Sequence, residues 1–186
     1  MTARERFEAL YRSALDPFGY ETSAYERRKY AITLAALPRE RYARGFEPGC
    51  SIGVLTALLA RRCDELVASD VSALAVERAR DRLAGMPGVR VERRAIPDEW
   101  PEGSFDLVVL SEVAYFLEPA ELDRTVRLAV AALQPGGDLV VVDWLGPIEG
   151  YPLDGADVHQ RIGCEPALER VVRHEERDFV LEVFRA

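Results

Sequence analysis

The segment from residue 44 to residue 144 alternates strand-like and helix-like runs, and this rhythm limits the folds open to the chain. The hydrophobic patterns predict strands at 44–47, 65–69, 89–93, 105–111 and 138–144, and helices at 52–62, 72–85 and 119–133. Strands that are joined by helices form parallel sheets with right-handed crossovers and helices on both faces. The sequence therefore predicts an α/β domain.

Further elements are expected on both sides of this segment. Two helices, at 2–15 and 23–37, come first, and each begins with a capping-box spacing, Thr2 with Glu5 and Ser23 with Glu26. After residue 144 the stretch 145–163 is loop-rich and uneven. Two strand-like runs follow, at 168–173 and 178–184, and the short gap between them predicts a hairpin at the end of the α/β unit.

Composition excludes several functional classes. A chain of 186 residues fits a single domain, and its formal net charge of −8 opposes binding to a nucleic-acid backbone. Apolar runs such as LVVVDWL are too short to span a bilayer, and the first residues lack a signal-peptide core. Cys50, Cys63 and Cys164 match neither a disulfide framework nor a zinc site. We expect a reduced cytoplasmic protein without bound metal, nucleic acid or membrane.

The stretch FEPGCSIGVLTALLA, residues 46–60, contains a glycine turn with three interpretations. G-x-S-x-G can mark a nucleophilic serine, but that elbow follows several strands, whereas Ser51 follows the first predicted strand. A dinucleotide fingerprint would need glycine at Ser51 and at Val54. Asp70, at the end of the second predicted strand, does lie at the distance expected of an acid that binds ribose hydroxyls.

The third interpretation explains more residues. E-x-G-x-S-x-G from Glu47 to Gly53 resembles the first motif of class I S-adenosylmethionine-dependent methyltransferases, usually written E/D-x-G-x-G-x-G. WPEGSFDLVVLSEVAYFL resembles their fourth motif, and LQPGGDLVVV resembles the turn before their fifth strand. Within that superfamily the chain is most similar to the nodulation-protein-S-like group, through DPFGYETSAYERRKYAITLAAL, the glycine turn, FDLVVLSEVAYFL and DVH, over about residues 16–160.

This resemblance implies a fold and an activity. The fold would be the Rossmann-like class I methyltransferase fold, an α/β architecture with a mostly parallel seven-stranded sheet, a C-terminal antiparallel hairpin and helices on both faces. The single domain, 1–186, would comprise a helical lid at 1–40, a cofactor-binding core at 41–144 and a substrate loop with the hairpin at 145–186. S-adenosylmethionine would be the cofactor and S-adenosylhomocysteine its product. The reaction would be N-methylation of a small-molecule amine, such as an amino sugar or oligosaccharide, by a monomer or homodimer.

The resemblance also assigns cofactor contacts. Gly49 and Gly53 would let the backbone approach the cofactor, Glu47 would favour its ammonium group, and Ser51 would keep the loop tight. Asp70 would hold the ribose and Val71 would lie against the adenine. Arg94 stands where many relatives carry an acid that binds the adenine amino group, which leaves Ala95 and Ile96 to cover that ring. The remaining expected contacts are Ser111 and, on one face of the second helix, Tyr25 and Lys29, whose ammonium would pair with the carboxylate of the cofactor.

The acceptor is expected at the carboxyl ends of the fourth and fifth strands, where ligands bind in open α/β sheets. Glu112 and His159 are the candidates for a carboxylate anchor and a general base. The other expected acceptor contacts are Tyr115, Phe116, Asp143, Trp144 and Asp157. A small-molecule O-methyltransferase, a cofactor-binding protein without turnover and an NAD-dependent oxidoreductase remain as alternatives.

Overall fold

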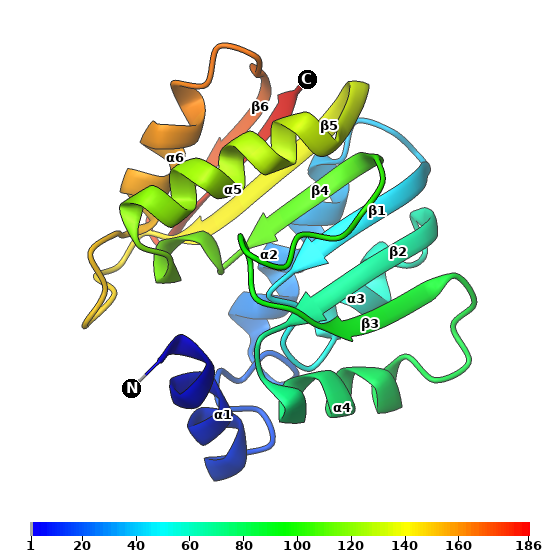
Figure 1. The fold of residues 1–186 in the computed structure, drawn as a ribbon, viewed down its shortest axis with the longest axis vertical. Coiled ribbons are helices and arrows are strands. Elements are labelled where there is room, and N and C mark those ends of the chain that lie inside the picture. Colours follow the sequence, from blue (N-terminus) through cyan, green and yellow to red (C-terminus); the bar gives the residue numbers. More distant parts are fainter. Residues whose placement is uncertain (1) are drawn as a thin grey trace. The chain divides into compact units, whose positions relative to one another are not determined.

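The computed structural model describes residues 2–186, and the chain divides into two compact units, Met1–Ala95 and Ile96–Ala186 (Figure 1). Each unit contains its own group of hydrogen-bonded strands with helices packed against them. The boundary lies inside the segment 41–144, which was expected to form one continuous core. The expected division of a single domain into lid, core and hairpin stays a prediction.

The first unit is a parallel sheet with four helices. Its strands lie in the order β3-β2-β1, and α3 and α4 both pack against β2. The elements, in chain order, are α1 (Ala3–Ser13), α2 (Ala24–Ala36), β1 (Tyr42–Pro48), α3 (Val54–Leu59), β2 (Cys63–Asp70), α4 (Ala73–Arg82) and β3 (Val89–Arg93).

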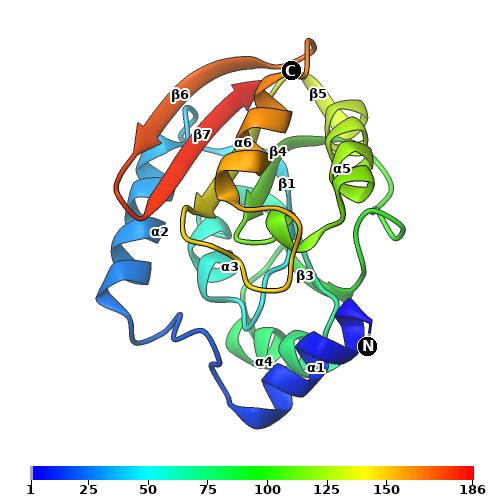
Figure 2. The same ribbon diagram turned by 90° about the vertical axis from the view of Figure 1, so that its left-hand side faces the viewer.

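The second unit is a mixed sheet whose strands lie in the order β4-β5-β7-β6. β4 and β5 are parallel, whereas β7 runs antiparallel to both β5 and β6. Figure 2 shows β6 and β7 side by side, and α6 packs against β5 and β7. The elements are β4 (Phe105–Ser111), the short 3₁₀-helix η1 (Ala114–Phe116), α5 (Pro119–Ala132), β5 (Leu133–Trp144), α6 (Gly155–Gly163), β6 (Glu169–Glu175) and β7 (Phe179–Arg185).

Local sequence signals account for the helix starts. Thr2 Oγ1 accepts a hydrogen bond from the backbone N–H of Glu5, and the Glu5 carboxylate accepts one from the N–H of Thr2. This is the predicted capping box of α1, and it satisfies two donors that the first helical turn leaves unpaired. Ser23 and Ser72 also cap α2 and α4, each through a side-chain oxygen that accepts from one backbone N–H of the first turn.

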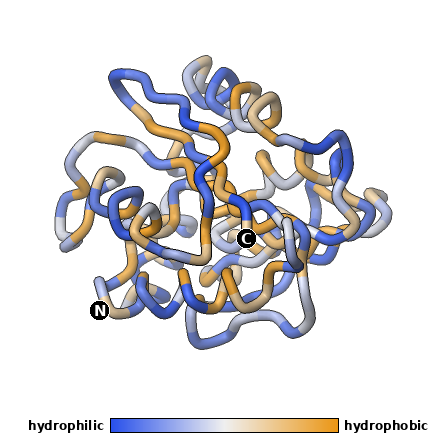
Figure 3. Tube along the Cα trace, turned by 90° about the horizontal axis from the view of Figure 1, so that it is seen from above, coloured by the Kyte–Doolittle hydropathy of each residue, from blue (hydrophilic) through white to orange (hydrophobic). Residues whose placement is uncertain are grey.

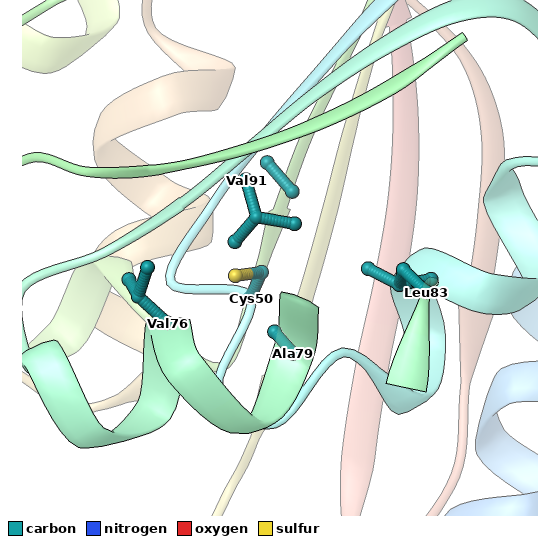
Figure 4. Close-up of a cluster of buried hydrophobic side chains, with 6 residues drawn as sticks. Cys50, Val76, Ala79, Leu83 and Val91 are labelled. Carbon is teal, nitrogen blue, oxygen red and sulfur yellow. The ribbon is translucent and has the colours of Figure 1, made fainter. Parts of the chain in front are cut away.

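Burial follows the apolar runs of the sequence. β4 is buried from Phe105 to Leu110, as expected for a strand covered on both faces. Figure 3 shows hydrophobic and hydrophilic segments alternating along the chain. In the first unit, Val76 and Ala79 of α4, with Leu83 just after it, pack against Cys50 and against Val91 of β3 (Figure 4).

The predicted seven strands and the C-terminal hairpin are all found in residues 2–186, and β3 and β4 have the predicted bounds. The stretch 145–163, expected to be loop-rich, also contains a helix that was not predicted, α6 at Gly155–Gly163. Asp154 and Asp157 form a capping box at its start, with reciprocal side-chain to backbone hydrogen bonds of 2.9 and 3.1 Å. None of the helices in residues 2–186 has the length and apolar character that crossing a membrane requires.

Candidate functional site

The loop between β1 and α3 has three residues in the left-handed region, at Gly49 (φ 74°), Ser51 (φ 51°) and Gly53 (φ 80°). Glycine adopts such angles without a steric penalty. A Cβ atom at Gly53 would also lie 3.2 Å from Cα of Ala79 and from Cδ1 of Leu83, so α3 starts in close contact with α4. The G-x-S-x-G spacing therefore corresponds to a turn in which alternate residues are left-handed.

Ser51 occupies the middle of this turn without being glycine, which costs about 1–2 kcal/mol of backbone strain. Its Oγ accepts a 2.6 Å hydrogen bond from the hydroxyl of Tyr11 in α1, and its N–H donates to Asp70 Oδ2 at 2.9 Å. An activated serine needs an adjacent base, whereas the partner of this hydroxyl is a tyrosine. The geometry therefore disfavours the nucleophile interpretation of G-x-S-x-G.

Asp70 ends β2 beside this loop. Its Oδ1 accepts from the N–H of Ser72 at 2.9 Å, while Oδ2 accepts from Ser51, so one carboxylate ties together the loops that follow β1 and β2. Burial raises the pKa of Asp70 to about 6, against the opposing effect of these backbone N–H groups. A carboxylate has about four acceptor positions, so acceptor capacity remains for further donors such as ribose hydroxyls.

Glu47, the penultimate residue of β1, is 2% exposed. Among residues 2–186 its Oε2 atom meets no hydrogen-bond partner. Burial raises the pKa of Glu47 to about 8, and the nearby Asp70 charge acts in the same direction. Buried polar atoms are normally paired, so this oxygen fits a ligand that supplies a donor, and a cationic donor would also offset the cost of ionising Glu47.

In α2, Tyr25 and Lys29 share one face, as predicted. The Lys29 ammonium lies 4.9 Å from the centre of the Tyr25 ring and 3.0 Å from Oε1 of Glu26, and its side chain is 2% exposed. The buried Glu26 therefore neutralises the charge that was expected to meet a cofactor carboxylate. The assignment of Lys29 to the cofactor stays a prediction.

The residues expected around adenine lie beyond β2 and β3. The Val71 carbonyl accepts from Nε of Arg93 at 3.1 Å, and the Arg94 N–H donates to the Asp70 carbonyl at 3.1 Å. Arg94 pairs with Glu92, its Nε 2.5 Å from Oε2. Ala95 is the last residue of the first unit and Ile96 the first of the second, and their assignment to adenine stays a prediction.

In the second unit, Ser111 ends β4 and Glu112 follows it in a left-handed conformation, at φ 54°. The Glu112 N–H donates to the Val142 carbonyl at 2.8 Å. Its Oε2 atom accepts from the hydroxyl of Tyr115 and from the N–H of Trp144 at 3.3 Å. Contacts from η1 and from the end of β5 thus hold a half-buried carboxylate at the carboxyl edge of the β4–β5 pair.

Aromatic rings lie next to Glu112. Phe116 packs edge-on against Tyr115, with ring centroids 4.6 Å apart, and against Tyr151, with centroids 4.8 Å apart. Trp144 leaves 38% of its surface exposed, and a Cβ atom at Gly146 would overlap its ring. Tyr115 contacts Glu112 through its hydroxyl and Trp144 through its backbone N–H, and Phe116 and Tyr151 pack next to Tyr115. Their assignment to the acceptor stays a prediction.

His159 of α6 lies inside the second unit. Its Nδ1 is 2.7 Å from Oε2 of Glu182 on β7, and its Nε2 is 3.3 Å from Oδ2 of Asp143 on β5. Burial alone lowers the pKa of His159, but the hydrogen bonds and charges of these two carboxylates outweigh it and raise the pKa to about 9. An imidazolium cannot accept a proton, so this environment opposes the expected role of His159 as a general base.

Two further expected acceptor contacts are used internally. Asp143 is fully buried against His159, and the Asp157 carboxylate accepts from the N–H of Asp154 in the capping box of α6. Sequence reasoning missed three residues that contribute here, Tyr11, Tyr151 and Glu182. A tyrosine on the apolar face of a predicted helix, like Tyr11, is indistinguishable from a core residue until its hydroxyl partner is known.

In this α/β fold the penultimate residue of the first strand is a buried acid, Glu47, and a left-handed glycine turn follows that strand. A second acid, Asp70, is hydrogen-bonded to that turn. Together these features define a class I S-adenosylmethionine-dependent methyltransferase. The family model described as Nodulation protein S (NodS) matches residues 6–143. The chain belongs to the NodS family, as predicted.

Curated relatives and solved structures agree. Nodulation protein S of Bradyrhizobium diazoefficiens is 33% identical over 75% of this chain and 69% of that protein, and its counterpart in Rhizobium tropici is 31% identical over 75% and 60%. A putative methyltransferase from Pseudomonas syringae is 46% identical, with a TM-score of 0.79 over 88% of this chain and all of that one.

The N-methyltransferase NodS of Bradyrhizobium japonicum WM9, solved with S-adenosylhomocysteine, gives a TM-score of 0.87 over 99% of this chain and 98% of its own, at 24% identity. The similarity confirms the predicted fold class.

Proposed function

We propose that this methyltransferase N-methylates a small-molecule amine, with an amino sugar or an oligosaccharide that carries one as the acceptor class. The observation that carries the proposal is Glu112, a carboxylate held in a strained backbone conformation at the end of β4, with aromatic rings beside it. Strain of this kind persists where the surroundings over-determine it, and such residues cluster at functional sites. The family's nodulation proteins, one of them described as an N-methyltransferase, support the same reaction.

The first unit would hold the cofactor. Gly49 and Gly53 would let the loop backbone approach its methionine part, Glu47 would accept from its ammonium group, and Asp70 would accept from its ribose hydroxyls. The orphaned Oε2 atom of Glu47 and the spare acceptor positions of Asp70 support this assignment. S-adenosylmethionine supplies an electrophilic methyl group on a sulfonium, so the chain itself needs no covalent nucleophile.

Glu112 would receive the acceptor. A carboxylate attracts a protonated amine and orients it, and it can take up the proton that the amine must lose before it attacks. Phe116, Tyr151 and Trp144 offer apolar faces on which the C–H surface of a sugar packs. Tyr115 would keep Glu112 in place through its hydroxyl. The net charge of −8 also suits a cationic acceptor better than an anionic one.

His159 takes a different part in this arrangement. As an imidazolium between Asp143 and Glu182 it would fasten α6 to β5 and β7, and so position the loop that carries Tyr151 and leads on from Trp144. This role follows from its burial and its two carboxylate partners. Ser111 and Asp157 would act indirectly, by fixing the backbone at the end of β4 and in the first turn of α6.

The test measures S-adenosylhomocysteine formation with glucosamine and its short oligomers, each paired with the N-acetylated form as a control. Amine-dependent turnover that disappears on acetylation is the expected result. Glu112→Gln should lower kcat/KM at least about tenfold, since hydrogen bonds to charged groups contribute about 1.5–3 kcal/mol, while its affinity for S-adenosylhomocysteine changes less than about twofold. Glu77→Gln, at an exposed site on α4, is the matched control.

Other outcomes would point elsewhere. Turnover only with hydroxyl acceptors would favour the O-methyltransferase alternative. Binding of S-adenosylhomocysteine without turnover on either panel would favour a protein that binds the cofactor without catalysis. Binding of NAD alone would contradict the assignment of the first unit.

A further inference from the structure

The contact between Tyr11 and Ser51 joins α1 to the glycine turn. The two residues are 40 positions apart, both are buried, and the tyrosine hydroxyl donates to Oγ of Ser51 at 2.6 Å. Ser51 in turn donates its N–H to Asp70. A hydrogen-bonded chain therefore runs from α1 through the turn to the acid that ends β2.

Tyr11 does not depend on Ser51 for its own position. The Arg78 guanidinium of α4 donates to the carbonyls of Tyr11 at 2.7 Å and of Ala14 at 2.8 Å. One turn earlier in α1, the Glu8 carboxylate accepts from the Ser72 hydroxyl at 2.7 Å and from the Ala73 N–H at 2.9 Å. These contacts fix α1 on α4, so the Tyr11 hydroxyl is a fixed donor.

Ser51 is the residue that needs support. Its neighbours in the alternating pattern, Gly49 and Gly53, reach positive φ without strain, whereas an L side chain rarely adopts φ 51°. The hydrogen bond from the Tyr11 hydroxyl to Oγ stabilises the left-handed conformation of Ser51, and this conformation keeps the Ser51 N–H directed at Asp70. A glycine at position 51 would adopt the same angles without help but would not be linked to α1.

We propose that Tyr11 is a positioning residue for the cofactor loop, which holds Ser51 in the left-handed conformation and thereby keeps the loop in its binding-competent shape. The inference rests on the proposed function in one respect, that this loop binds the cofactor. Tyr11 and Ser51 form a compensating pair. The tyrosine hydroxyl is needed because residue 51 is a serine, and it becomes dispensable when residue 51 is glycine.

The experiment is a double-mutant cycle with Tyr11→Phe and Ser51→Gly, in which S-adenosylhomocysteine affinity is measured by calorimetry and unfolding midpoints are measured without ligand. When the loop is competent for only a fraction of the time, the apparent dissociation constant rises by the inverse of that fraction. Tyr11→Phe in the Ser51 protein should weaken binding about fivefold, the size of one net buried hydrogen bond. In the Ser51→Gly protein the same change should alter affinity by less than about twofold.

The matched control is Glu77→Gln, at an exposed site on α4. It should change affinity by less than about twofold with serine or with glycine at position 51. Tyr11→Phe keeps the ring and its packing, and the unfolding midpoints show that each variant folds.

Equal effects of Tyr11→Phe in both backgrounds, with wild-type binding intact, would overturn the inference, because Tyr11 would then act only by packing. The inference also fails if Tyr11→Phe changes affinity in neither background. Failure of the wild-type protein itself to bind S-adenosylhomocysteine or S-adenosylmethionine would instead refute the proposed cofactor site, and the inference with it.

Discussion

Glu47 gives the sharpest quantitative prediction, because its charge state should change if the cofactor ammonium binds beside it. The carboxyl group is 2% exposed, and its pKa is raised to about 8, by burial first and then by the Asp70 charge. At pH 7 the free protein therefore holds Glu47 about nine-tenths protonated. An ammonium group bound there would favour the carboxylate, so binding would release a proton.

The magnitude follows from linkage. Ionising a group one pKa unit below its midpoint costs about 1.4 kcal/mol, so affinity at pH 7 should be about tenfold below its value with Glu47 fully ionised. Between pH 6.5 and pH 7.5 the ionised fraction rises from about 0.03 to about 0.24, which predicts an affinity increase of about eightfold. Asp70, with a pKa of about 6, is mostly ionised over this interval and adds little to the slope.

Calorimetry with S-adenosylhomocysteine measures both quantities. Titrations at pH 7 in two buffers of different ionisation enthalpy should show release of about 0.9 proton per molecule bound. Glu47→Gln should bind more weakly, with no pH slope and no proton release. A wild-type protein that binds well, releases fewer than about 0.2 protons and changes affinity less than about twofold over this interval would refute the reasoning.

Two further predictions concern stability. Gly53→Ala should destabilise the fold by about 2 kcal/mol or more in urea unfolding and should weaken cofactor binding. The reason is that φ 80° strains any side chain and the new Cβ would press on Ala79. The control is Gly85→Ala, at φ 85° with open space around it, which should show the strain alone and keep normal binding. His159→Gln should cost about 3–5 kcal/mol, as expected when one partner of a buried charge cluster is removed. The wild-type pKa of His159 is raised to about 9, so its contribution should be complete below about pH 6.5 and lost as pH rises through about 9, and urea midpoints of the variant should lack this decline.

Sequence patterns predicted the elements whose signals are local. The run FDLVVLS has no polar interruption until its end, apart from Asp106, and it forms β4 with the expected bounds. Thr2 and Ser23 cap their helices as expected because a capping hydrogen bond spans only three residues. β1 extends past the predicted 44–47 to Tyr42 and Pro48, since pairing with β2 orders residues whose own strand propensity is low.

The helix α6 was missed for a physical reason. Glycine and proline recur through residues 146–155, and they mask the D-x-x-D spacing of Asp154 and Asp157. That spacing makes the same reciprocal hydrogen bonds as the T-x-x-E box of Thr2 and Glu5 at the start of α1. Had it been read as a cap, the apolar repeat of Val158 and Ile162 would have indicated a short helix.

The ionic partners of His159 were beyond reach from sequence, because they depend on which strands become neighbours. Glu182 lies on β7 opposite Val141 of β5, and this register brings its carboxylate to the imidazole of α6. Sequence alone treated Asp143 and His159 as groups near an acceptor. The two buried carboxylates raise the pKa of this histidine, which opposes a role as a base.

Ser51 and Glu112 also depend on partners that could not be identified from sequence. In residues 2–186 these are the non-glycine residues with positive φ, each follows a strand end by one to three positions, and each receives a hydrogen bond from a tyrosine hydroxyl, Tyr11 or Tyr115. A sequence motif identifies the strained position, because glycine or a polar residue stands there. It does not identify the hydrogen-bond donor that stabilises the strained backbone, because that donor comes from another part of the fold. A strained backbone conformation persists only while its surroundings stabilise it. The two tyrosine hydroxyls provide that stabilisation, so the tyrosines are as much a part of the candidate site as the motif residues. Substitutions that remove either hydroxyl should therefore impair function more than their burial alone would suggest.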